Sequence, residues 1–86
     1  MLPMNPRTTS VEPMENFRLL VTFANGERRI FDVSPYLNYP AFKRLANPGY
    51  FALARPDHGT VWWPGDIDFC SDTVYLESVP LGELRS

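Results

Sequence analysis

The sequence predicts a small α+β domain, in which an antiparallel sheet of four to five strands, built from hairpins, carries a short helix and helical turns on one face. Three observations predict it. The length of 86 residues suits one domain, and 44% hydrophobic residues with 14% aromatics are enough for a core. Residues 17–23 place apolar side chains at every second position, which is the period of a strand. Asn25-Gly26 follows at once, and this dipeptide is typical of a hairpin turn.

The two ends of the chain differ from its middle. We expect residues 1–9 to form a flexible N-terminal tail, residues 10–78 the single α+β domain, and residues 79–86 a C-terminal tail. The first nine residues contain two prolines and show no apolar period. A short strand is expected near residues 10–12, where Pro13 then interrupts pairing because proline lacks an amide hydrogen.

The register of the first clear hairpin follows from the side chains. A two-residue loop would pair Phe23 with Arg28 and mix apolar and charged residues on one face. A three-residue loop, residues 24–26 with Gly26 left-handed, keeps one face apolar. Because a slip of one residue inverts every side chain, we predict the three-residue loop. It pairs Arg18 with Asp32, Leu19 with Phe31, Leu20 with Ile30 and Thr22 with Arg28.

Later elements follow from turn and capping residues. Ser34 is expected to cap a helical turn over residues 34–37, and a short helix is expected over residues 41–46. Residues 50–55 are expected to be extended, and residues 57–59 to form a tight turn before the strand at residues 60–63. Ser71 or Asp72 is expected to cap a final helix over residues 73–77.

These elements carry a recognisable order of residues. One strand ends Phe-x-Asn-Gly, the next ends Phe-Asp, and after a helix come Gly-x-Val-x-Trp-Pro and an Asp-rich helix start. Over about residues 11–78 this order resembles the bacterial domain-of-unknown-function family 2442. The residues that carry the likeness are Phe23, Gly26, Phe31, Asp32, Phe42, Leu45, Phe51, Gly59, Val61, Trp63, Pro64, Asp68, Asp72 and Tyr75.

The resemblance implies a compact α+β domain and supplies no catalytic residues. Members of this family are often encoded beside another small protein, which implies a toxin and antitoxin pair. Some relatives carry an additional helix-turn-helix segment, and we expect none here. The chain departs from the family pattern at Gly65-Asp66 and at Cys70-Ser71.

Charge and composition narrow the partners. The net charge is −2 and the pI is about 5.2, without a basic run, which makes nucleic acid an unfavourable partner. No apolar stretch approaches the roughly 20 residues that span a bilayer, so we expect no membrane partner. The start of the chain lacks the pattern of a signal peptide, so we expect a cytoplasmic protein.

The reactive side chains favour structural roles, and we expect no enzyme activity, no metal and no cofactor. His58, the one histidine, is expected to be a solvated turn residue. Cys70 is expected to be packed and inert, with neighbouring carboxylates raising its thiol pKa. Asp66, Asp68 and Asp72 form an acidic cluster that suits turns and helix caps better than a cation.

Three aromatic residues are the candidate binding residues. Neighbours on a strand face opposite ways, so if Trp63 is in the core, Trp62 faces outward, either toward a partner or under the chain's own tail or helix. Tyr36 and Tyr39 flank the helix break, where they either frame a groove with Trp62 or form the edge of the core.

The function we expect is a protein-interaction domain, as the antitoxin-like member of a two-gene system or as a homodimer. The alternative is a small ligand-binding domain or enzyme that uses the acidic cluster near Trp62. A second alternative is a transcription regulator.

Overall fold

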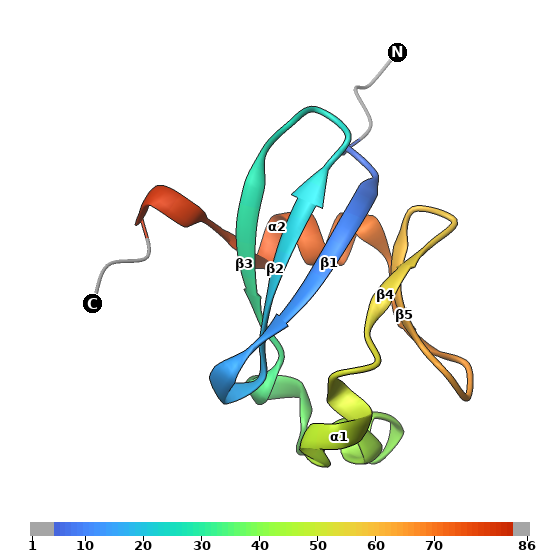
Figure 1. Cartoon of the computed structure of the whole chain (residues 1–86). Coiled ribbons are helices and arrows are strands. Elements are labelled where there is room, and N and C mark those ends of the chain that lie inside the picture. The colour runs from blue at the N-terminus through green and yellow to red at the C-terminus, as the bar shows by residue number, and fades with distance from the viewer. Residues whose placement is uncertain (1–4, 84–86) are drawn as a thin grey trace.

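The computed structural model describes residues 5–83, which form two antiparallel sheets with short helical segments (Figure 1). One sheet has the order β1-β2-β3-β7, with β1 at Thr8–Met14, β2 at Arg18–Phe23, β3 at Arg28–Asp32 and β7 at Val79–Pro80. The other has the order β4-β5-β6, at Arg55–Asp57, Thr60–Trp63 and Ile67–Phe69. The helices are α1 (Pro48–Phe51) and α2 (Ser71–Glu77), and the 3₁₀ helices are η1 (Glu15–Phe17), η2 (Ser34–Tyr36), η3 (Pro40–Ala46) and η4 (Leu81–Glu83). The α+β class is confirmed.

The β2–β3 hairpin has the predicted register. Arg18 pairs with Asp32, Leu19 with Phe31, Leu20 with Ile30 and Thr22 with Arg28. Gly26 has a φ of +89°, so it takes the left-handed position of the three-residue loop. The Asn25 side chain accepts a hydrogen bond from the Glu27 amide at 3.0 Å, which fixes the loop. The register therefore follows from one apolar face together with one glycine.

Both ends of the described chain take part in the first sheet. β1 begins at Thr8 and continues through Pro13, which lies opposite Leu19. Pro13 therefore does not interrupt pairing, because an edge strand tolerates a missing amide hydrogen on its outer side. At the other end, Val79 and Pro80 pair with β3. Residues 1–4 and 84–86 of the expected tails lie outside the described residues, and the domain limits at 10 and 78 stay predictions.

The segment before β4 corrects the sequence prediction, because residues 48–51 are helical where residues 50–55 were expected to be extended. Asn47 begins α1: its side chain accepts hydrogen bonds from the Gly49 and Tyr50 amides at 2.9 and 3.3 Å. Pro48 follows in the first turn, where its fixed φ favours a helix. The extended strand starts only at Arg55.

The cap of the helical turn at residue 34 also differs from expectation. The Ser34 side chain does not cap η2. Instead, the Ser34 amide and hydroxyl donate to Asp32 Oδ1 at 3.0 and 2.6 Å. The N-cap position is Val33, and the Asp32 side chain, at the end of β3, satisfies the first amide of η2.

The β4–β5 hairpin has the expected tight turn. Asp57 pairs with Thr60, so His58 and Gly59 alone form the loop, with φ values of +50° and +84°. Two successive left-handed residues match the turn that suits the twist of a hairpin. The Thr8 amide donates to the Gly59 carbonyl at 3.1 Å, which ties β1 to this second sheet.

The core lies between the inner faces of the two sheets and α2. Trp63, Phe31 and Leu19 are among its fully buried side chains. Phe69 contacts several rings at once, with centroid distances of 5.2 Å to Phe31 and 5.9 Å to Trp63. The indole of Trp63 also donates to the Phe51 carbonyl at 2.9 Å. Edge-to-face rings of this kind stabilise a core beyond their buried area.

Candidate functional site

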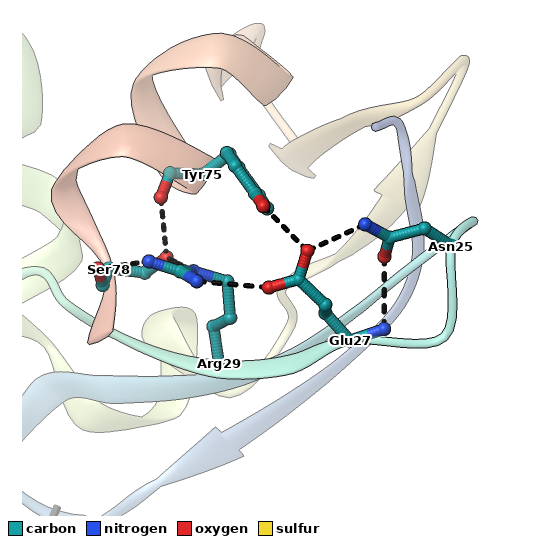
Figure 2. Close-up of polar contacts among 5 residues, drawn as sticks. All are labelled: Asn25, Glu27, Arg29, Tyr75 and Ser78. Atoms are coloured by element: carbon teal, nitrogen blue, oxygen red, sulfur yellow. Dashed lines mark hydrogen bonds and ion pairs between the residues drawn. The ribbon is translucent and has the colours of Figure 1, made fainter. Parts of the chain in front are cut away.

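A polar cluster joins the β2–β3 loop to α2 (Figure 2). The Tyr75 hydroxyl donates to Glu27 at 2.5 Å, and Arg29 donates to the other oxygen of Glu27 at 3.1 Å. Arg29 also donates to the Ser78 hydroxyl and carbonyl at 2.7 and 2.9 Å. Its guanidinium lies 4.5 Å from the centre of the Tyr75 ring. The Asn25 amide completes the cluster by donating to Glu27 at 2.6 Å.

The chemistry of this cluster is structural. The hydrogen bonds from Tyr75 and then Asn25 lower the pKa of the Glu27 carboxyl, with a further contribution from Arg29. The same bond to Glu27 raises the pKa of the Tyr75 hydroxyl. Glu27 therefore stays charged and Tyr75 stays neutral around pH 7, so neither is poised for proton transfer there. The cluster holds the C-terminal end of α2 against the hairpin.

Sequence reasoning did not find this cluster, although one signal was present. Arg29 pairs with Val21, so it occupies an inward position on a strand whose other inward side chain, Phe31, is fully buried. A charged side chain on an apolar face needs polar partners. Apart from Glu27, two positions away, those partners are Tyr75 of α2 and Ser78 after it, nearly 50 positions away in the sequence.

Trp62 lies on the outer face of the second sheet. It pairs with Arg55 on one side and with Asp68 on the other, so the three side chains form one row across β4, β5 and β6. The Arg55 guanidinium lies 4.8 Å from the centre of the Trp62 ring. Trp62 is half-buried, whereas Trp63 is fully buried. The predicted opposite orientation of the two tryptophans is what the structure has.

Tyr36 and Tyr39 lie together but apart from Trp62. Their ring centroids are 6.2 Å apart, and Tyr36 packs edge-to-face on Phe69 at 5.0 Å. Phe69 pairs with Val61, so its side chain is on the inner face of the sheet, opposite to that of Trp62. Burial raises the pKa of the Tyr36 hydroxyl, whereas Tyr39 is 55% exposed. The three residues therefore do not form one groove, and their binding role stays a prediction.

His58 and the acidic residues are dispersed. The His58 side chain is 89% exposed at the β4–β5 turn, 3.2 Å from Asp57. Asp66 lies in the β5–β6 turn with a φ of +65°, and Asp68 lies on the outer face of β6. Asp72 accepts a hydrogen bond from Asn5 at 3.3 Å. Within residues 5–83, no group of three or more His, Cys, Asp or Glu side chains is placed to hold a metal ion.

Cys70 corrects the sequence prediction, because it is exposed rather than packed. It is the N-cap residue of α2, which begins at Ser71, so neither Ser71 nor Asp72 is the cap. Hydrogen bonds from the Thr73 hydroxyl and amide lower the pKa of the Cys70 thiol, whereas the Asp72 charge opposes this to a smaller extent. The expectation from charge alone was wrong because helix-end hydrogen bonds outweigh the carboxylate.

An open groove lies between the β1–β2 turn and α1. Its volume is about 560 Å³, and it is lined mainly by apolar side chains such as Met14, Phe17 and Phe51. Asn16 and Phe17, in the turn, have φ values of +61° and +58°. Left-handed conformations are unfavourable for bulky residues, and such strain concentrates at binding sites. The edge-to-face contact between Phe17 and Phe51, at 5.3 Å, holds the strained turn against α1.

Comparison with known proteins gives a family and no function. The model of one protein family, described as "Protein of unknown function (DUF2442)", matches residues 8–80. Neither a curated protein nor a solved structure matches the chain. In the described part of the chain, every helix is too short or too polar to cross a membrane.

Proposed function

The chain belongs to the DUF2442 family, whose description assigns no activity, and we propose a function from its surface. The chain is a protein-interaction domain that binds a small protein through the outer face of the second sheet. The observation that carries the proposal is the row formed by Arg55, Trp62 and Asp68. Tryptophan and arginine are the side chains most enriched among residues that dominate binding energy. Here the guanidinium of Arg55 lies over the ring of Trp62, at the centre of a sheet face.

The charges around Trp62 define the partner. Asp57 shares the outer face with Arg55, since the two are two positions apart on β4, and Asp68 lies on the other side of Trp62. The partner therefore presents an apolar pocket for the indole with basic side chains at its rim. This fits the acidic pI of about 5.2.

The finer proposal is that the partner is the toxin-like product of an adjacent gene, with this chain as its antitoxin. An acidic domain can cover a basic surface by charge complementarity, which accelerates association and makes it sensitive to salt. The family resemblance supplies the expectation of a neighbouring small protein.

The test is calorimetric binding of the full chain to the product of the neighbouring gene. Trp62→Ala is expected to weaken binding by at least tenfold, because removing a central aromatic anchor costs on the order of 2 kcal/mol. The matched control is Leu76→Ala, since Leu76 is 67% exposed on α2, and we expect no change. Binding that tolerates Trp62→Ala would place the interface elsewhere, and failure of the two proteins to bind would refute the finer proposal.

A second candidate function, small-ligand binding, is favoured by the groove beside α1. Its volume of about 560 Å³ lies within the range of ligand sites. Its lining is mainly apolar and also contains the carboxylate of Glu15, at the turn. We expect an apolar ligand with a cationic group, and tryptamine is a suitable probe. Amide shifts confined to residues 14–17 and 49–52 on titration with tryptamine would support this function, and their absence would refute it.

A further inference from the structure

The four-stranded sheet has one covered and one open face. α2 lies behind β1, β2 and β3 in Figure 1, on the side of the buried residues Leu19, Val21 and Phe31. No described helix crosses the front of these strands. Because side chains alternate along each strand, the residues that pair across the strands and face this open side form three rows.

The central row of the open face is mainly apolar. It runs through Glu12, Leu20, Ile30 and Val79, each paired with the next across β1, β2, β3 and β7. Ile30 itself is only 2% exposed, so the accessible apolar side chains of this row are Leu20, which is half-buried, and Val79, which is 40% exposed. Leu81, 38% exposed, extends this strip from η4, which contacts β3.

The rows on either side carry charges of both signs. Arg28 lies in one row beside Thr22, and Arg18 and Asp32 lie together in the other. None of the charged side chains on this face forms an ion pair with another described residue. With Glu12, the face carries two positive and two negative charges, so its sum is zero, whereas the chain carries −2. A face that carries no net charge and has unpaired charges of both signs can pair with a surface that carries the same pattern of charges.

The arrangement along β3 is self-complementary, and we infer that this open face binds a second copy of the chain, with the two four-stranded sheets packed face to face. Ile30 is the centre, with Arg28 two residues before it and Asp32 two residues after it, all on one face. A twofold axis across the strands at Ile30 sets Arg28 of each copy opposite Asp32 of the other. It also sets Leu20 against Leu20 of the second copy.

The distances between packed sheets allow this pairing. Packed sheets lie about 10 Å apart, a gap that an arginine and an aspartate side chain span together. Their strands cross at about 30°, and Arg28 and Asp32 lie only about 7 Å from the axis, so the crossing displaces them by roughly 3 to 4 Å. The like charges of Glu12 face each other only at the outer strand β1, where water screens them.

The size of the face sets the strength of the association. With strands about 4.8 Å apart, five residues each of β1, β2 and β3 and the two residues of β7 cover roughly 270 Å² of flat sheet. This is less than half of the roughly 800 Å² that each partner buries in a standard interface. An interface of this size is typical of weak, transient association, so we expect the dimer to coexist with monomer. It uses a different sheet face from the one proposed for the protein partner.

The test is sedimentation velocity of the full chain between about 10 and 500 μM. The wild type is expected to shift from monomer toward dimer across this range. Arg28→Asp and Leu20→Lys are each expected to weaken association at least tenfold. Arg28→Asp places a carboxylate opposite Asp32 of the second copy, and Leu20→Lys places two lysines opposite each other at the twofold axis. The double variant R28D/D32R restores the opposite charges and is expected to return within threefold of the wild type. Trp62→Ala, on the other sheet, is the control that dimerises normally.

A dilution series followed by amide NMR shifts provides the second measurement, because Asp32 also accepts a hydrogen bond from the Ser34 amide in η2 and its replacement can disturb that turn. Concentration-dependent shifts are expected on β2, β3 and β7. A wild type that stays monomeric at 500 μM overturns the inference. So do single variants that dimerise like the wild type, or shifts confined to residues 55–69.

Discussion

The adjacent residues Trp62 and Trp63 allow one substitution to be compared in two environments. Trp63→Phe removes part of a fully buried ring, so we expect the free energy of unfolding to fall by about 1 to 2 kcal/mol from lost packing. This is a fraction of the roughly 3 to 5 kcal/mol that truncation of a buried aromatic residue to alanine costs. It also removes the indole donor to the Phe51 carbonyl. That carbonyl still accepts from the Ala54 amide at 3.2 Å, so only about 0.5 to 1.5 kcal/mol is added. The expected total is about 1.5 to 3.5 kcal/mol.

Trp62→Phe is the matched control. It keeps a ring on the outer face, so we expect a loss below about 0.7 kcal/mol, mainly from a weaker contact with Arg55. Urea unfolding followed by circular dichroism measures both free energies, and thermal unfolding is expected to separate the midpoints by roughly 5 to 20 °C. Equal losses from the two variants would refute the opposite orientation of the tryptophans.

Three further predictions concern a turn, the polar cluster and the thiol. Gly26→Ala is expected to lower the free energy of unfolding, measured in urea, by about 1 to 2 kcal/mol. The loss comes from backbone strain alone, since an added Cβ meets no atom within 4 Å. Gly26→Asn is expected to lower this free energy less, because asparagine tolerates a positive φ better than alanine does. The lowered pKa of Glu27 contributes stability that is present above the ordinary pKa of a glutamate and is lost as the pH falls through the lowered value. Tyr75→Phe is expected to reduce this loss as the pH falls below the ordinary pKa of a glutamate, and an unchanged slope of unfolding free energy against pH would contradict the assignment. The Cys70 thiol, whose pKa is lowered, is expected to react with a disulfide reagent at lower pH than a free cysteine, and Thr73→Val is expected to move the rate profile back.

The parts of the fold that the sequence predicted depend on local chemistry. The β2–β3 register needed only an alternating strand and a glycine that accepts a positive φ. The turn at His58 and Gly59 was equally local. The helix α1 was also encoded locally, by Asn47 and Pro48, but the sequence prediction placed a helix only over residues 41–46 and an extended segment from residue 50.

The candidate sites were less predictable because they combine distant segments. Trp62 was placed on an outer face by the alternation within one strand, but its contact with Arg55 depends on the pairing of β4 with β5. Of the two alternatives for Tyr36, a groove with Trp62 or the edge of the core, the packing of Tyr36 on Phe69 favours the edge of the core. The groove beside α1 needed the position of Phe51 relative to the β1–β2 turn.

The sequence by itself determined the α+β class, the hairpins and the opposite orientation of the two tryptophans, because alternation and turn residues act over only a few positions. Only the tertiary structure decided which charges have partners. Arg29 reaches Ser78 and Tyr75 across nearly 50 residues, whereas Arg28, the residue before it, faces open solvent on the other side of the same strand. The energy of a charged group depends on what surrounds it in space, and those surroundings come from segments that the chain brings together only when it folds.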